Sequence, residues 1–204
     1  MHTYLKSFIF IMLMIGGSLG STLIAQINAG KIYHSNKKVI CRNGAVVSAN
    51  PLASMAGIEM LKQGGNAVDA AIAIQLALAV VYPGAGNIGG GGFMVAHLTN
   101  GVNVTIDFRE KAPAGASRDM YLDTNQNVVP GKSENGHPAA GVPGSVAGIF
   151  SYYKYAKLPF KKLINPAIDL AEQGFAITEA EASDLNEHQE DFKKYNSRLP
   201  VFVK

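Results

Sequence analysis

GAGNIGGGGFMVAHLTNGVNVTIDF, residues 84–108, contains a run of glycines followed by two apolar segments that Asn100-Gly101 separates. An Asn-Gly pair between two β-rich segments is typical of a tight hairpin turn. In the second segment every other residue from Val102 to Phe108 is apolar and the intervening residues are polar, so one face is predicted to pack inward. We therefore expect an antiparallel hairpin whose second strand leads to Arg109.

Two helices are expected before the hairpin. Asn50 and Pro51 suit the N-cap and the first position of a helix, and Gly64-Gly65 supply its end. The face predicted to be buried carries apolar residues at intervals of three: Leu52, Met55, Ile58 and Leu61. Before this helix, residues Val39 to Ser48 contain enough β-branched residues to predict a short strand.

The second helix should run from Asn66 to about Val81, because this segment is strongly apolar and contains no Pro or Gly. Only Asp69 and Gln75 are polar after its start, so the helix is expected to be buried nearly all round. Roughly fifteen residues at ~1.5 Å each are too short to cross a bilayer. A central helix between other layers is therefore predicted.

The segment after Arg109 predicts a long ordered loop and further helices. Residues 123–148 are rich in Gly, Pro, Asn and Ser, and helical spacing resumes over Val146, Ile149, Phe150 and Tyr153. Another helix is predicted from Pro166 to Gln173, and a capping-box spacing at Thr178 opens a helix toward Tyr195. This order of elements indicates a mixed α/β domain, layered as in α+β proteins, whose sheet is covered by helices.

Composition favours a globular protein and excludes several functions. The 204 residues are 48% hydrophobic and 16% charged, and the formal net charge is +3. The basic residues are scattered, which argues against nucleic-acid binding. Cys41 is the only cysteine, so no internal disulfide can form, and without clustered histidines no zinc site is expected.

Residues 1–25 have the layout of a signal peptide, with Lys6 before the apolar stretch Phe8 to Ile15 and small residues afterwards. This apolar core is too short to span a bilayer comfortably, and no nearby cysteine could take a lipid anchor. We expect cleavage and release to the periplasm or the medium, with an uncleaved anchor as the alternative. Residues 26–38 are expected to form a polar connector.

Several residues match a motif only superficially. Residues 84–89 spell G-x-G-x-x-G, but a helix is predicted before them and a strand after them, the reverse of a dinucleotide site. Ser145 lacks the flanking glycines of a nucleophile elbow. His97 and His137 have no evident partner and receive no chemical role. Asn103 begins an N-glycosylation triplet within a predicted strand and is interpreted as a chance match.

Arg109 is the candidate binding residue. It follows the second hairpin strand within Asp107-Phe108-Arg109-Glu110, where a guanidinium can present a rigid pair of donors to a carboxylate. The alternative is an ordinary surface ion pair with Asp107 or Glu110. Local physics alone leaves both open.

Several motifs in order resemble those of gamma-glutamyltransferases, also called gamma-glutamyltranspeptidases or glutathione hydrolases. They are Asn50 to Ser54, Leu61 to Ala71, Gly86 to Met94, Asp107 to Glu110, Ala112-Pro113, Arg118 to Asp123, Gly141 to Gly148, Pro166-Ala167 and Gly174-Phe175. The resemblance implies an N-terminal-nucleophile hydrolase fold, a four-layer αββα sandwich. Residues 39–204 would form part of the large subunit of a precursor that cuts itself into large and small subunits.

The resemblance also implies a role for Arg109: in this family the arginine of that motif holds the α-carboxylate of the gamma-glutamyl donor, such as glutathione. The family's nucleophile is a threonine at the start of the small subunit, and no segment here matches it. We therefore expect no catalytic residue, cofactor or metal ligand in this chain, and no activity from it alone. A non-enzymatic extracytoplasmic module that retains part of the fold is the alternative.

Overall fold

The structure is a computed structural model that describes residues 40–196 and 203. The chain divides into two compact units, Met1–Arg42 and Asn43–Lys204. The expected signal peptide and connector lie outside the described residues, and the elements below all belong to the second unit.

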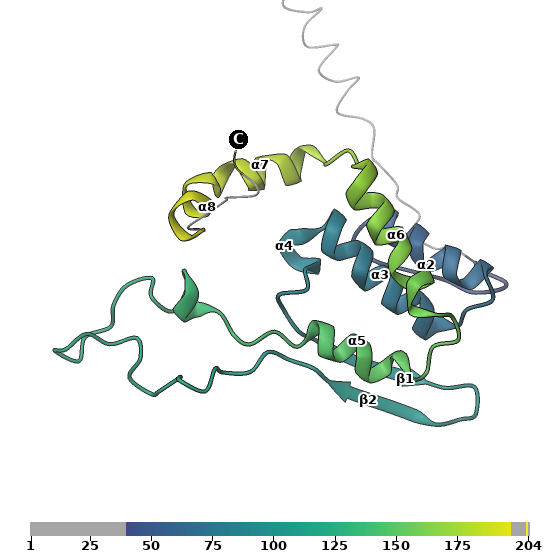
Figure 1. Ribbon diagram of the computed structural model, residues 1–204, viewed down its shortest axis with the longest axis horizontal. Helices are drawn as coiled ribbons and strands as arrows, with labels where there is room; N and C mark the ends of the chain where they lie inside the picture. Colours follow the sequence, from purple (N-terminus) through teal and green to yellow (C-terminus); the bar gives the residue numbers. More distant parts are fainter. Residues whose placement is uncertain (1–39, 197–202, 204) are drawn as a thin grey trace, which may run out of the picture. The chain divides into compact units, whose positions relative to one another are not determined.

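Ten short elements follow one another in the described part of the second unit, and the order of helices and hairpin is the predicted one (Figure 1). They are helices α2 (Pro51–Lys62), α3 (Ala67–Val81) and α4 (Pro83–Gly86), strands β1 (Phe93–His97) and β2 (Asn103–Asp107), the 3-10 helix η1 (His137–Ala139), and helices α5 (Ser145–Tyr153), α6 (Phe160–Gln173), α7 (Glu179–Glu187) and α8 (Gln189–Tyr195). No helix of the described residues has the length and apolar character needed to cross a membrane.

The antiparallel hairpin is confirmed. β1 pairs with β2 so that Phe93 faces Asp107 and His97 faces Asn103. In the connecting loop the amide of Gly101 donates to the Leu98 carbonyl at 2.9 Å. Gly101 adopts φ +83°, a conformation that glycine tolerates. The strands alternate between exposed and partly buried residues as predicted.

The two faces of the hairpin differ in what covers them. Met94, Ile106 and Phe108 pack against the buried core, and α5 contacts β2 on this side (Figure 1). On the opposite face Phe93 is 63% exposed and Val95 is 82% exposed. Among the described residues, the sheet therefore carries helices on one face only.

Helix α2 forms where expected but buries a different face. Asn50 caps it by accepting from the Leu52 amide at 2.9 Å, as predicted. The buried residues are Ala53, Ala56, Gly57 and Met60, whereas Met55 is 63% exposed and Ile58 is 40% exposed. The predicted Leu52-Met55-Ile58-Leu61 face was wrong for Met55 and Ile58, although Leu52 packs against the core. Small residues allow closer helix packing on the other face: a Cβ on Gly57 would lie 2.6 Å from Cδ1 of Ile74 in α3.

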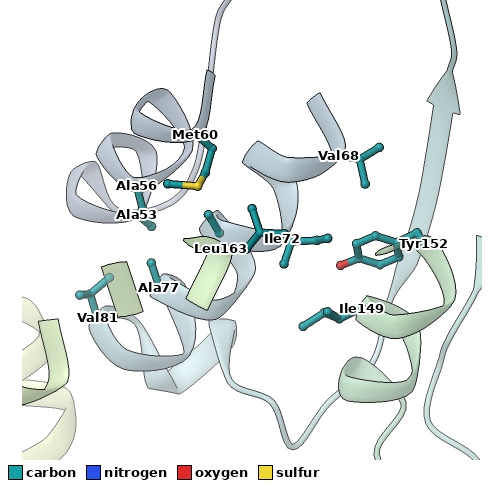
Figure 2. Packing of buried hydrophobic residues seen from close by; sticks show 11 residues of the cluster. Ala53, Ala56, Met60, Val68, Ile72, Ala77, Val81, Ile149, Tyr152 and Leu163 are labelled. Atoms are coloured by element: carbon teal, nitrogen blue, oxygen red, sulfur yellow. The ribbon is translucent and has the colours of Figure 1, made fainter. Parts of the chain in front are cut away.

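Helix α3 is the central helix that the sequence predicts. Asn66 caps it within a capping box completed by Asp69, and it contacts α2, α4, α5 and α6. Figure 2 shows Ile72 of α3 near Leu163 of α6, with Ile149 and Tyr152 reaching toward it from α5. These residues belong to one continuous buried cluster, so α3 joins the other helices into a single core.

Asp69 is fully buried in this core, and backbone groups satisfy its carboxylate. Its oxygens accept from the amide of Asn66 at 2.7 Å, of Lys157 at 3.0 Å and 3.1 Å, and of Leu158 at 2.9 Å. Asn66 adds a bond from its side-chain amide to the Tyr155 carbonyl at 2.7 Å. The start of α3 is thereby tied to the connection between α5 and α6.

The strand predicted from Val39 to Ser48 is absent over residues 40–48, which have no regular structure. A strand needs a partner, and the sheet of the described residues contains only β1 and β2. Val47 is 91% exposed, while Val46 packs close to Gly57 of α2. The segment therefore runs beside a helix instead of joining the sheet.

Two later helices differ from the prediction in their bounds. α6 begins at Phe160 instead of Pro166, because the additional turns bury Leu163 in the core. Pro166 inside α6 has no amide hydrogen, so the carbonyl of Lys162 lacks its helical donor. Lys162 is an exposed residue, which lowers the cost of this missing bond. The capping box at Thr178 is confirmed, but the helix toward Tyr195 is divided into α7 and α8 at His188.

The long loop and helix α5 form as expected. Residues 111 and 142 and residues 122 and 128 form isolated bridges within the loop. Ile149 is buried and Tyr153 partly buried, but Val146 is 47% and Phe150 is 56% exposed. The remaining buried positions of α5 are Ser145, Gly148 and Tyr152.

Replacing Asp69 by alanine should lower the free energy of unfolding by about 3 kcal/mol or more, because the partly buried hydrogen bonds from the amides of residues 66, 157 and 158 would lose their acceptor. Asp69→Asn, which keeps one acceptor oxygen, should cost less. Chemical denaturation monitored by circular dichroism measures both. The exposed Asp169→Ala on α6 is the matched control and should change stability by no more than about 0.5 kcal/mol.

Candidate functional site

Arg109 projects from the end of β2 at a point where the backbone is held on both sides. The amide of Phe108 donates to the Gly92 carbonyl at 2.9 Å, which extends the hairpin pairing by one residue. The amide of Arg109 then donates to Oδ1 of Asp107 at 2.9 Å. These bonds fix the direction in which the side chain leaves the sheet.

The guanidinium of Arg109 is paired with Glu110 through Nε alone. Nε donates to Oε2 at 2.9 Å, and the side chains are 60% exposed for Arg109 and 32% for Glu110. Within residues 40–196, no side chain or carbonyl accepts a hydrogen bond from the terminal nitrogens of Arg109. The alternative prediction of an ion pair with Glu110 is thus confirmed. Because this pair uses Nε alone, the two terminal nitrogens could still form a bidentate pair with a ligand carboxylate.

Two further groups define the surroundings of the guanidinium. Cζ of Arg109 lies 5.8 Å from the centroid of the Phe93 ring, within the range of a cation–π contact. Phe93 heads β1 and faces Asp107 across the hairpin, so the pairing register brings this ring beside the arginine. The sequence prediction missed Phe93, for which the register set by Asn100-Gly101 was the available signal.

The pKa of the Glu110 carboxyl is lowered from its usual value. Hydrogen bonding by its own backbone amide is the largest cause, followed by the hydrogen bond from Arg109; the Arg109 charge and the Gly91 amide add to them, and partial desolvation opposes the shift. Glu110 is therefore ionised at neutral pH. An ionised Glu110 keeps its acceptor oxygen directed at Nε and helps to orient the guanidinium.

Arg109 borders a pocket of about 520 Å³. The pocket is lined by residues 107–111, 142–144, 147, 148 and 151, which come from the end of β2, the long loop and the first turns of α5. A pocket of about 580 Å³ lies between α2 and α6 and is lined by side chains such as Glu59, Lys162 and Asp169. The pocket beside Arg109 is the candidate site, because there a guanidinium whose terminal nitrogens have no partner among the described residues borders a cavity.

The remaining candidates from the sequence acquire no chemistry. Ser145 is 2% exposed in the first turn of α5, and its amide donates to the Gly90 carbonyl at 3.0 Å. His97 is exposed and bonded to the Asn103 side chain at 2.8 Å, and Cys41 is exposed. The described residues contain no group of His, Cys, Asp and Glu side chains arranged to hold a metal ion.

The carboxyl of Glu110 should titrate below pH 4.5 in the chain and move part of the way upward in Arg109→Ala. The shift should be partial because the backbone donors, which include the largest cause, remain. Since the folded pKa is lowered, the ion pair is present at neutral pH and is lost as the pH falls through that pKa. Carboxyl NMR titration measures the midpoint, and an unchanged midpoint in the variant would contradict the pairing.

Among the described residues, a hairpin packed under helices thus carries an arginine whose terminal nitrogens have no hydrogen-bond partner, and this arginine borders a pocket of a mixed helix–sheet fold. The sequence profile described as Gamma-glutamyltranspeptidase matches residues 53–204. The chain is 49% identical over 161 residues to a glutathione hydrolase proenzyme of Pseudomonas sp. (strain A14), covering 78% of this chain and 28% of the relative. It is also 49% identical over 148 residues to that of Escherichia coli (strain K12), covering 72% and 26%.

The fold agrees with these matches. The crystal structure of Helicobacter pylori gamma-glutamyltranspeptidase superposes with a TM-score of 0.75 and 54% identity, covering 78% of this chain and 46% of that chain. The chain therefore belongs to the gamma-glutamyltranspeptidase family, a family of glutathione hydrolase enzymes, and the expected partial N-terminal-nucleophile hydrolase fold is confirmed. It spans between a quarter and a third of the length of the two proenzymes, 26% and 28%.

Proposed function

We propose that this chain supplies the donor-binding part of an enzyme that cleaves gamma-glutamyl amides such as glutathione and transfers the glutamyl group to water, amino acids or peptides. The observation that carries the proposal is Arg109 beside its pocket, with Nε bound by Glu110 and the terminal nitrogens available. Membership of a family whose relatives are named glutathione hydrolase proenzymes supports the substrate class.

The chemistry of this arrangement is binding and orientation. A carboxylate accepts two parallel hydrogen bonds from a guanidinium, which fixes both its position and its plane. The Phe93 ring lies over the guanidinium, and Glu110 accepts a hydrogen bond from its Nε. Both contacts restrict the rotamers of Arg109, so less conformational entropy is lost when the ligand binds. In the proposed reaction, the α-carboxylate of the glutamyl donor is held here so that its γ-carbonyl faces the nucleophile in a defined geometry.

The nucleophile is proposed to come from a partner segment, a threonine that begins the small subunit of the same precursor. Its own amine would take the hydroxyl proton as the base while the hydroxyl oxygen attacks the γ-carbonyl. The γ-glutamyl C–N bond would then break, the leaving amine would take up that proton, and a glutamyl ester would remain. Residues 39–204 would then be part of the large subunit and inactive by themselves. The proenzyme names of the relatives support processing of a precursor.

Export of the protein is a second part of the proposal, and it rests on the signal-peptide layout of residues 1–25. The mature protein is expected in the periplasm or outside the cell, with its new N-terminus shortly after Ala25. Mass spectrometry of the N-terminal peptide from fractionated cells tests this. A protein that retains Met1 in the cytoplasmic fraction would contradict it.

Arg109→Ala in the complete protein that carries this chain should lower kcat/KM for a gamma-glutamyl donor by roughly a hundredfold or more, since loss of one partner of a charge-assisted pair costs about 2–5 kcal/mol. The donor KM should rise, and kcat should also fall because orientation is lost. Arg109→Lys should recover only part of the activity, because an ammonium cannot form the bidentate pair.

Two comparisons make the result specific. Arg118→Ala removes an arginine whose side chain is 95% exposed, and it should leave the kinetics unchanged. A donor analogue without the α-carboxylate should react equally slowly with the wild-type protein and with Arg109→Ala. Unchanged donor kinetics in Arg109→Ala would remove the proposed site, and absence of any gamma-glutamyl activity in the complete protein would favour the non-enzymatic module.

A further inference from the structure

The backbone that carries Arg109 lies between glycines from two distant parts of the chain. A Cβ on Gly91 would lie 2.5 Å from the Phe108 carbonyl oxygen and 2.8 Å from the Glu110 amide nitrogen. A Cβ on Gly144 would lie 2.8 Å from the Phe108 carbonyl carbon and closer still to its oxygen. Real Cβ atoms are essentially never found so near to other atoms, so both positions require glycine for a close backbone approach.

Gly148 plays the corresponding part for the side chain of Phe108. A Cβ at this position would lie 2.6 Å from Cδ2 of the ring and 2.9 Å from Cβ, with Cγ nearer than either. Gly148 lies in the middle of α5, where alanine would be the better helix former. Glycine at position 148 therefore lets the Phe108 ring pack against α5, although it lowers the stability of the helix itself.

The ring of Phe108 also lies near Tyr152, about one turn beyond Gly148 in α5. Its centroid lies 5.9 Å from that of Tyr152, which is 3% exposed. The Tyr152 hydroxyl donates to the side chain of Gln75 in α3. Phe108 is thus held between the hairpin and the buried core, and it immediately precedes Arg109.

Displacement of this ring would move the guanidinium. Phe108 is the last residue whose amide and carbonyl pair with Gly92, so a shift at Phe108 disturbs the pairing from which Arg109 projects. Gly148 and Arg109 also line the same pocket. A methyl group on α5 would therefore act at the base of the arginine instead of at its terminal nitrogens.

We propose that Gly148 is a positioning residue for donor binding: by leaving room for the Phe108 ring, it sets where Arg109 meets the α-carboxylate. The inference rests on the proposed function of Arg109 and adds a residue that acts on it through the Phe108 ring. Misplacement of a binding group by about 1 Å can cost up to about a hundredfold in rate. We therefore expect Gly148→Ala to lower kcat/KM for the donor by roughly tenfold or more, mainly through KM.

The test is a double-mutant cycle in the complete protein that carries this chain, with Gly148→Ala, Arg109→Ala and the combined variant assayed on one gamma-glutamyl donor. Gly148→Ala should raise the donor KM by about tenfold with Arg109 present and by less than about twofold in the Arg109→Ala background. Gly115→Ala is the matched control, because its added methyl group would meet no atom within 4 Å. It should leave KM unchanged.

Each outcome separates the inference from the function on which it rests. An equal loss from Gly148→Ala in both backgrounds would indicate general disruption or blockage of the pocket, and would overturn the inference while Arg109 keeps its role. No effect of Gly148→Ala would overturn it as well. No effect of Arg109→Ala would instead defeat the proposed function, and the inference with it.

A second variant keeps the test decisive if Gly148→Ala does not fold. Phe108→Leu removes the ring without adding atoms to α5, so it disturbs the same contact from the other side. It should raise the donor KM only when Arg109 is present, with the fraction of folded protein verified by circular dichroism. A KM unchanged in Phe108→Leu would contradict the positioning role of this contact.

Discussion

A buried carboxylate determines how the helices are joined. Asp69 accepts hydrogen bonds from amides at the start of α3 and at residues 157 and 158, and Asn66 reaches the carbonyl of Tyr155. A buried carboxyl group needs hydrogen-bond donors from the protein. The amides of residues 157 and 158 can donate to Asp69 only when the α5–α6 connection lies against α3. The position of α5 follows from this contact, and α5 in turn supports the strand that carries Arg109.

Local signals in the sequence predicted the elements well where the chemistry is local. Asn50 and Asn66 cap α2 and α3, and Asn100-Gly101 turns the hairpin, because each depends on a few neighbouring residues. The buried face of α2 could not be predicted from large apolar residues. Gly57 and Ala53 allow α3 to approach, and that advantage depends on the shape of the partner helix, which the spacing of apolar residues within α2 does not reveal.

The same division applies to the site. Arg109 is proposed as a binding residue because it lies in a contiguous motif at the end of a predicted strand and this motif resembles that of the family. The proximity of Gly144 and Gly148 to Phe108 could not be predicted, since some 35 to 40 residues separate them and the contact exists only after α5 packs on the hairpin. The strand predicted before Ser48 failed for a related reason: β-branched residues favour extended backbone, but only a neighbouring strand makes a sheet.

The uncovered face of the hairpin has a practical consequence for work with this chain in isolation. Phe93 and Val95 present apolar surface on a sheet whose two strands, within the described residues, each have an unpaired edge. Such an edge offers backbone donors and acceptors to any other extended chain, and apolar side chains strengthen the contact. Recombinant preparations of these residues should therefore self-associate as concentration rises, and lysine or glutamate at position 95 offers a direct route to a more tractable sample.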